Sequence, residues 1–226
     1  MTQGVLLKRY KRFLIDVRLR NGHIITAHCP NTGSMKTCSE PGRTVYLSLH
    51  KNPKRKYKYT WEIIDMPGSL VGVNTMVPNK LVKEAATRGK IKGLEEYSRV
   101  RSEVVVSDHS RLDLLLETDS GERCYIEIKN TTLVQEGAAY FPDAVTIRGR
   151  KHLEELARLA KIGHRAVILF LIQRMDAVSF SPADHLDPDY GRMLRRVAKE
   201  GVEILPCDVS LDLDRIDLRQ TVPVEL

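Results

Sequence analysis

Cysteine, tryptophan and long apolar runs are all scarce in this 226-residue chain. The four cysteines, at positions 29, 38, 124 and 207, form no C-x-x-C pair, which argues against a structural zinc site. Cys124 and Cys207 lie in apolar segments, so we expect buried thiols rather than a disulfide framework. The longest apolar run, Ala166–Ile172, is far too short to span a bilayer.

Several functional motifs are absent as well. The first residues lack an apolar signal segment, because Leu6 and Leu7 are followed at once by basic residues, and we therefore expect a cytoplasmic protein with no membrane partner. The chain has no phosphate-binding glycine loop, which excludes a P-loop NTPase. No helix-turn-helix pattern is evident, which disfavours sequence-specific promoter recognition. Nothing in the pattern supplies a base for Cys29 or Ser34, so we interpret Asn31–Ser34 as a turn.

Charge is present in quantity and is unevenly distributed. The chain has 36 Lys and Arg against 29 Asp and Glu, a net charge of +7. Residues 1–80 contain 14 basic and 4 acidic residues, whereas residues 81–226 contain 22 and 25. This contrast suggests two modules, and the basic one would favour a polyanionic partner. The alternative is a solvated surface with a chance excess of lysine.

The first module, residues 1–78, has the pattern of a small all-β domain. Apolar residues alternate with polar ones from Phe13 to Leu19, and an Asn21-Gly22 turn follows. Further strands are predicted at His23–His28, Thr44–Leu49 and Tyr57–Asp65. Short strands separated by turns predict a barrel or a sandwich.

The second module, residues 79–226, alternates helices and strands. Asn79 is expected to cap a helix that starts at Lys80. The other helices are predicted at Arg150–Ile162 and Tyr190–Lys199. Strands are predicted at Val104–Val106, Leu112–Leu116, Cys124–Ile128, Ala166–Ile172 and Val202–Leu205. The resulting order predicts an α/β domain around a mixed sheet.

An acid, an acid and a lysine on two of these strands indicate chemistry. Asp113 interrupts a strongly apolar strand, where a carboxylate is costly to bury without a partner or a metal. Glu127 and Lys129 are two residues apart and share one face of the next strand. If the strands pair, Asp113, Glu127 and the Ile128 carbonyl can hold Mg²⁺, or Mn²⁺, and Lys129 can assist phosphodiester hydrolysis. The alternative is a solvated face with a cross-strand ion pair.

Four segments resemble the sugar fermentation stimulation protein A family, and the resemblance covers nearly the whole chain. They are Pro30–Met35, Ser110–Asp113, Glu127–Asn130 and Phe141–Leu153. The resemblance implies an α+β, two-domain protein, with an N-terminal OB-fold-like β-barrel followed by an α/β PD-(D/E)XK (restriction-endonuclease-like) domain. It also implies DNA binding without sequence preference and a regulatory role in maltose metabolism.

The resemblance assigns roles residue by residue. Asp113 matches the first acid of the PD-(D/E)XK superfamily, and Glu127 and Lys129 match its E-x-K. Leu112 stands where the superfamily has a proline. Glu84 matches the acid of the first helix.

Residues near this motif provide accessory candidates. Arg148 and Lys151 lie at the start of a predicted helix, where they can contact a phosphate with the help of the helix dipole. Asp143 is either an additional ligand or, as we favour, a turn residue after Pro142. Glu103 either joins the site or lies at an exposed strand end. His152 fits a packed helix residue better than a base.

A basic and aromatic segment in the first module indicates nucleic-acid binding. Its cations are Lys51, Lys54, Arg55, Lys56 and Lys58, and we expect them to contact phosphates. Tyr57, Tyr59 and Trp61 follow at a spacing of two, so on a strand they would share one face. They would either stack on bases or fill the barrel core.

The leading hypothesis is a DNA-binding protein without sequence preference that has a Mg²⁺-dependent phosphodiesterase site. The alternative is a non-enzymatic DNA-binding regulator on an inactive nuclease scaffold. The expected partner is DNA, single strands included. RNA stays open, because stacking and phosphate contacts do not read the 2′-hydroxyl.

Overall fold

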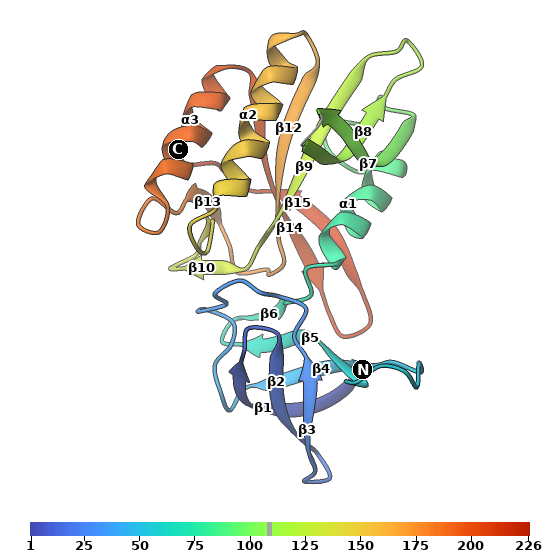
Figure 1. The fold of residues 1–226 in the computed structure, drawn as a ribbon, viewed down its shortest axis with the longest axis vertical. Coiled ribbons are helices and arrows are strands. Elements are labelled where there is room, and N and C mark those ends of the chain that lie inside the picture. Colours follow the sequence, from blue (N-terminus) through green and yellow to red (C-terminus); the bar gives the residue numbers. More distant parts are fainter. Residues whose placement is uncertain (108–109) are drawn as a thin grey trace.

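The computed structural model describes residues 1–107 and 110–226, which form a small barrel and a larger α/β domain stacked end to end (Figure 1). The chain passes from the barrel, at the bottom of the view, into the α/β domain through helix α1 (Val77–Thr87). Among the described helices none is long and apolar enough to cross a membrane.

The barrel is built from the first five strands, β1 (Thr2–Tyr10), β2 (Leu14–Leu19), β3 (Ile24–His28), β4 (Thr44–Leu49) and β5 (Tyr59–Met66). They pair in the order β3-β2-β1-β4-β5, and a parallel contact between His28 and Thr60 closes β3 onto β5. This single contact closes the sheet into an OB-like barrel that is partly open between β3 and β5. A short strand, β6 (Ser69–Gly72), extends from β5 towards the α/β domain.

The barrel core settles one of the open alternatives. Trp61 is fully buried among Leu6, Val17 and Leu47, and its Nε1 donates a hydrogen bond to the Ile63 carbonyl at 3.0 Å. Trp61 is therefore a core residue, which excludes it as a stacking platform. Tyr59 is half-buried at the start of β5, whereas Tyr57 precedes the strand, so the three rings do not form one face.

The α/β domain has a six-stranded mixed sheet in the order β15-β14-β12-β9-β8-β7. Its strands are β7 (Arg99–Ser107), β8 (Ser110–Glu117), β9 (Arg123–Thr131), β12 (Arg165–Ile172), β14 (Val202–Leu211) and β15 (Ile216–Thr221). Helices α2 (Ile147–Lys161) and α3 (Pro188–Lys199) cover one face, and α1 packs against the other (Figure 1). A separate sheet joins β10 (Leu133–Gln135), β11 (Ala138–Phe141) and β13 (Ser179–Pro182).

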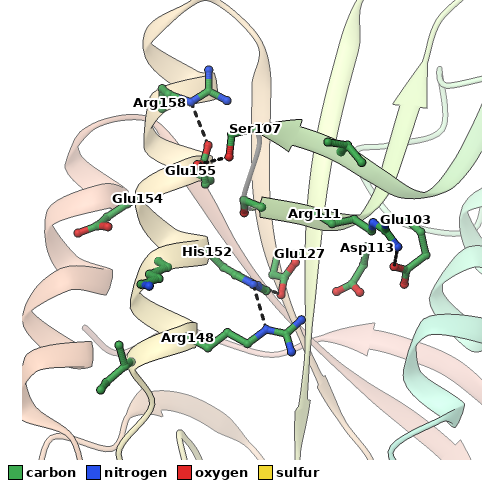
Figure 2. A pocket seen from close by; sticks show the side chains of 14 residues that line it. Glu103, Ser107, Arg111, Asp113, Glu127, Arg148, His152, Glu154, Glu155 and Arg158 are labelled. Carbon is green, nitrogen blue, oxygen red and sulfur yellow. Dashed lines mark hydrogen bonds and ion pairs between the residues drawn. The ribbon is translucent and has the colours of Figure 1, made fainter.

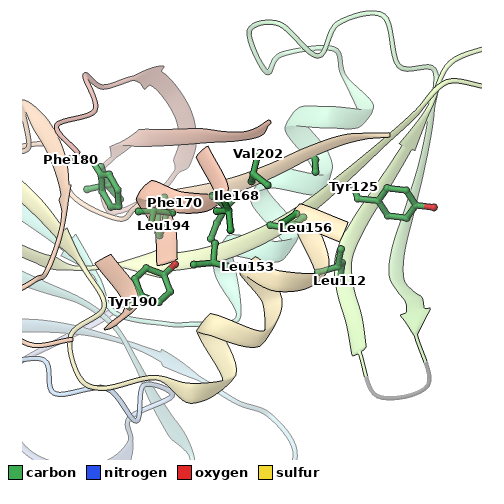
Figure 3. Packing of buried hydrophobic residues seen from close by; sticks show 14 of the residues in the cluster. Leu112, Tyr125, Leu153, Leu156, Ile168, Phe170, Phe180, Tyr190, Leu194 and Val202 are labelled. Atoms are coloured by element: carbon green, nitrogen blue, oxygen red, sulfur yellow. The ribbon is translucent and has the colours of Figure 1, made fainter. Parts of the chain in front are cut away.

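Helices on both faces explain the continuous apolar run in β12. Ile168 and Phe170 pack under α2 and α3 with Leu153 and Tyr190 (Figure 3). The alternate residues Val167, Leu169 and Leu171 belong to the cluster beneath α1. A central parallel strand buried on both faces has no polar side to expose. All four cysteines are free and buried, as expected for Cys124 and Cys207.

All three predicted helix starts were late, that of α3 by two residues because the helix begins at Pro188 and not at Tyr190. Helix α1 begins at Val77 with Met76 at its N-cap, so Asn79 is not the cap and its side chain is available elsewhere. Helix α2 begins at Ile147, three residues before the predicted start, and Thr146 caps it by accepting a hydrogen bond from the Gly149 amide. Gly149 lies in this first turn, and glycine is a poor helix former, so the turn could not be recognised from the sequence. The structure requires glycine there, because an added Cβ would crowd Thr146 and Tyr190.

The loop between β3 and β4, residues 29–43, joins the two domains and is called the barrel loop below. Asp143 of the α/β domain accepts hydrogen bonds from the Ser34 amide at 2.7 Å and from its hydroxyl at 3.3 Å. The Arg9 guanidinium donates to the carbonyls of Asn31, Gly33 and Ser34 at 2.8–3.2 Å. Asp143 therefore ties the loop to the α/β domain, and Arg9 fixes the shape of the loop from the barrel side.

Candidate functional site: a two-armed cleft at the end of β8 and β9

A cleft opens where β8 and β9 pass the first turns of α2, and it has two arms that meet at the same four residues. Asp113, Glu127, Arg148 and His152 line both arms. The outer arm, about 1060 Å³, extends between the β7–β8 hairpin and α2 (Figure 2). The inner arm, about 490 Å³, extends towards the barrel loop and is bounded by Asn31, Thr32 and Gly33.

Asp113 is held on β8 by two hydrogen bonds. Its Oδ2 accepts from the Ile128 amide at 2.7 Å, and its Oδ1 accepts from the Asn79 side chain at 2.7 Å. Burial raises the pKa of Asp113 to about 6, and the Glu127 carboxylate adds to this rise, while the two hydrogen bonds oppose it. Asp113 therefore lies close to the negative charge of Glu127, and its two hydrogen bonds only partly offset the rise in its pKa.

Glu127 is only 3% exposed, and its two carboxylate oxygens have different environments. Oε1 accepts from Lys129 Nζ at 2.6 Å and also bonds His152 Nδ1. Oε2 is buried and has no hydrogen-bond partner among the described residues. Burial alone would raise the pKa of Glu127, but His152 and Lys129 outweigh it and hold the pKa below its usual value. Glu127 is therefore an ionised side chain with one uncommitted oxygen.

His152 links this carboxylate to α2. Its Nε2 lies 3.4 Å from Arg148 Nε, and arginine can only donate, so Nε2 must accept. In the neutral ring the proton then lies on Nδ1 and is donated to Glu127 Oε1. Lys129 Nζ also lies 3.3 Å from Nδ1, and with this tautomer it donates to Glu127 alone. His152 is buried, as predicted for a packed helix residue, and it also orients Glu127.

The donor set at this point fits a hard divalent cation. A buried carboxylate oxygen without a partner lies beside a second carboxylate whose pKa is raised. In a strand the N–H and C=O of one residue point to the same side, so the Ile128 carbonyl points towards β8, as its amide does. In residues 1–107 and 110–226 no three acidic, histidine or cysteine side chains cluster as metal ligands. Backbone and water oxygens would complete the shell, as is usual for Mg²⁺.

The accessory acids lie in three different places. Glu103 lines the outer arm, where it pairs with Arg111 at 3.5 Å and is exposed. Asp143 lines the inner arm but is bonded to Ser34, so it fastens the barrel loop and is not simply a turn residue. Glu84 lies on another face of α1, beside β14 and β15, and its partner at 4.0 Å is Lys80. The residue that α1 brings to the site is Asn79 instead.

The predicted cationic residues are divided between two surfaces. Arg148 and Lys151 line the outer arm from the first turns of α2. The other cations of that arm, Arg111 and Arg158, are paired with Glu103 and Glu155. None of the residues from Lys51 to Lys58 lines either arm. They form the loop between β4 and β5, which in OB folds takes part in oligonucleotide binding.

Comparison with protein-family models gives two matches that together span most of the chain. Residues 7–73 match a model described as the SfsA N-terminal OB domain. Residues 76–215 match a model described as the sugar fermentation stimulation protein RE domain.

Individual proteins are similar over almost the full length. A sugar fermentation stimulation protein homolog of Pelobacter propionicus is 50% identical over 223 residues, covering 99% of this chain and 96% of that protein. A homolog of Geobacter sulfurreducens is 49% identical over 221 residues, covering 98% and 94%. The structure of Pyrococcus furiosus SfsA in complex with Ca²⁺ aligns with a TM-score of 0.89 at 28% identity, covering 100% of this chain and 96% of that one.

Proposed function

Because this chain belongs to the sugar fermentation stimulation protein family, with an OB-like barrel followed by a restriction-endonuclease-like α/β domain, we propose that it is a metal-dependent phosphodiesterase acting on nucleic acid. Residues 79–226 provide the hydrolytic site, and residues 1–78 hold the strand without reading its sequence. The resident cation is Mg²⁺ or Mn²⁺. Ca²⁺ in the Pyrococcus furiosus relative supports a divalent cation.

The observation that carries this proposal is the state of Glu127. One oxygen is saturated by Lys129 and His152, and the other is buried without a partner beside Asp113. An ionised carboxylate oxygen left unpaired in the interior is costly, unless a ligand completes it. A structural ion pair would need only the saturated oxygen.

Each residue of the site would then have its own role in hydrolysis. Asp113, Glu127 and the Ile128 carbonyl would hold the cation, which supplies charge neutralisation and an activated water. Lys129 places an ammonium beside the carboxylates and stabilises the negative charge that builds on the phosphate. Asn79 and the Ile128 amide fix the Asp113 rotamer, and His152 fixes that of Glu127. Arg148 and Lys151 position the phosphate from the N-terminal end of α2.

The expected substrate is DNA, single strands included, and RNA is a second form to be compared directly. Purified protein would be incubated with labelled single- and double-stranded DNA and RNA in Mg²⁺, Mn²⁺ or EDTA. Cleavage should require the metal. Lys129→Ala should lower the rate at least about 100-fold, which is the usual loss for a group acting at the reacting centre.

A matched control is Lys161→Ala, which removes a lysine from the far end of α2, where it pairs with Glu200. This variant should cleave at the wild-type rate. Binding without cleavage in any metal would reject the phosphodiesterase and favour a DNA-binding regulator. Undiminished cleavage by Lys129→Ala would reject the assigned site.

A further inference from the structure

The inner arm of the cleft has a chemistry different from that of the outer arm. Its walls, apart from the shared site residues, are mostly uncharged and polar: Asn31, Thr32, Asn130, Thr131 and Thr132, together with the ring of Tyr140. The outer arm contains charged residues along its whole length, among them Arg111, Lys151 and Arg158. The two arms therefore suit different parts of a substrate.

One buried group in the inner arm lacks a partner. Thr131 is 1% exposed and lines the arm, and its Oγ1 has no hydrogen-bond partner among the described residues. A buried hydroxyl without a partner indicates a ligand or a water in the arm. The Oδ1 of Asn130 accepts from Gln173 at 2.6 Å, and its side-chain nitrogen donates to no side chain or carbonyl among the described residues. Amide and hydroxyl groups of this kind recognise a base edge or a sugar.

A second phosphate would be poorly accommodated there. The acid Asp143 lines the arm. Of the two cations that line it, Lys129 is already bonded to Glu127, and Arg148 lies at the junction with the outer arm. Tyr140 also lines the arm, with its ring edge-to-face against His185 at 5.5 Å between centroids, and an aromatic side chain there can stack on a base. The arm therefore favours a neutral, planar group. That group would be attached to the phosphate that lies at Asp113 and Glu127.

The wall opposite β9 is rigidly built. Arg9 holds three carbonyls of the barrel loop, Asp143 holds Ser34, and Thr75 donates to the Pro30 carbonyl at 2.5 Å. Gly33 has no side chain, which is necessary because a Cβ there would collide with Asp143. A preformed wall of this kind lowers the entropy lost on binding.

The size of the inner arm limits its occupant. At about 490 Å³ it lies in the range of small-molecule pockets and is about half the volume of the outer arm. We propose that the inner arm binds the base and sugar of one unpaired nucleotide whose phosphate lies at Asp113 and Glu127. The strand must then be single or frayed at that position. The inference relies on the proposed function for the place of the phosphate.

The pocket can be tested without any cleavage. Isothermal titration calorimetry in Mg²⁺ would compare thymidine 5′-monophosphate, thymidine 3′-monophosphate and inorganic phosphate. We expect one of the two nucleotides to bind at least tenfold more tightly than phosphate. Thr131→Val, which removes only the unpartnered hydroxyl, should weaken that binding about 3- to 10-fold. Tyr140→Ala should weaken it about tenfold or more, and Tyr140→Phe should restore it.

The control is Ser110→Ala, which also removes a buried hydroxyl without a partner among the described residues but lies in the outer arm. It should leave nucleotide affinity unchanged. The inference is overturned if neither nucleotide binds better than phosphate, or if Thr131→Val and Ser110→Ala behave alike. Selective nucleotide binding by a protein that cleaves nothing would keep the inference and reject the proposed function.

Discussion

The fold without a bound metal disfavours the ionised form of the Asp113 side chain. Its pKa of about 6 means that the folded, metal-free protein keeps a proton that the unfolded chain releases near pH 3.8. The contribution of Asp113 to the free energy of unfolding of the metal-free protein therefore falls as the pH rises from about 3.8 to about 6. Above pH 6 the whole destabilisation by the ionised carboxylate is present. Functional groups commonly have such a cost.

Asp113→Asn should therefore stabilise the metal-free protein. We expect a gain of about 1–2 kcal/mol in the free energy of unfolding at pH 8, after allowance for partial exposure and for the altered hydrogen bond to Asn79. The gain should shrink towards pH 5, where the wild-type carboxyl is largely protonated in the fold. Urea unfolding in EDTA measures both values. A variant that is less stable than the wild type at pH 8 would contradict this assignment.

His152 is expected to act through Glu127. His152→Ala removes the Nδ1 donor and leaves Arg148 without its acceptor. Loss of a partner that orients a metal ligand usually costs 10- to 100-fold in metal affinity. The Mg²⁺ concentration for half-maximal cleavage should rise by about that factor. His152→Asn, which keeps a donor near the Nδ1 position, should recover much of the affinity. Equal losses in both variants would indicate that His152 only fills space.

The barrel loop is the element that decides how the two domains meet. Asp143→Ala would leave the Ser34 amide and hydroxyl without an acceptor at a half-buried position. Such a loss costs about 1–3 kcal/mol, and here it acts locally on the loop. Hydrogen exchange at residues 31–37 should accelerate several-fold. Asp214→Ala, on the exposed turn between β14 and β15, should leave that exchange unchanged. Exchange that is equally slow in both variants would show that Arg9 and Thr75 suffice.

At the level of elements, the sequence predicted strands and helices where the apolar period was clean. The alternation from Phe13 to Leu19 and the run from Ala166 to Ile172 each correspond to an observed strand. Strand β1 was missed because its register shifts between Leu6 and Lys8, which breaks the period of two. Strand β14 continues six residues beyond the predicted end at Leu205, and it runs through Pro206, a residue that is uncommon inside strands.

The candidate site was predictable in part. Asp113, Glu127 and Lys129 were expected on neighbouring strands. In the structure β8 pairs with β9, Lys129 bonds Glu127, and Asp113 accepts from the Ile128 amide. The contributions of Asn79 and the barrel loop were not predictable. Asn79 lies 34 residues before Asp113, and Ser34 lies 109 residues before Asp143, so no periodicity connects them. The catalytic roles stay predictions.

At the scale of the whole molecule, the cations of the β4–β5 loop and the cleft lie on different surfaces. A strand long enough to reach both would be held by the barrel and cut in the α/β domain. Lys54, Arg55, Lys56 and Lys58 replaced together by alanine should weaken binding to all sequences. The slope of log affinity against log salt should flatten by up to about 3 for single strands. An unchanged slope would move the binding surface elsewhere.

The central claim is that Asp113 and Glu127 hold a cation with whose help the protein hydrolyses a phosphodiester. It is tested most directly by single-turnover cleavage of a labelled single strand, with excess wild-type or Asp113→Asn protein, over a range of Mg²⁺ concentrations. We predict that the variant binds the strand with an affinity close to that of the wild type and cleaves it at least about 100-fold more slowly at every concentration. Cleavage by Asp113→Asn at the wild-type rate would contradict the account.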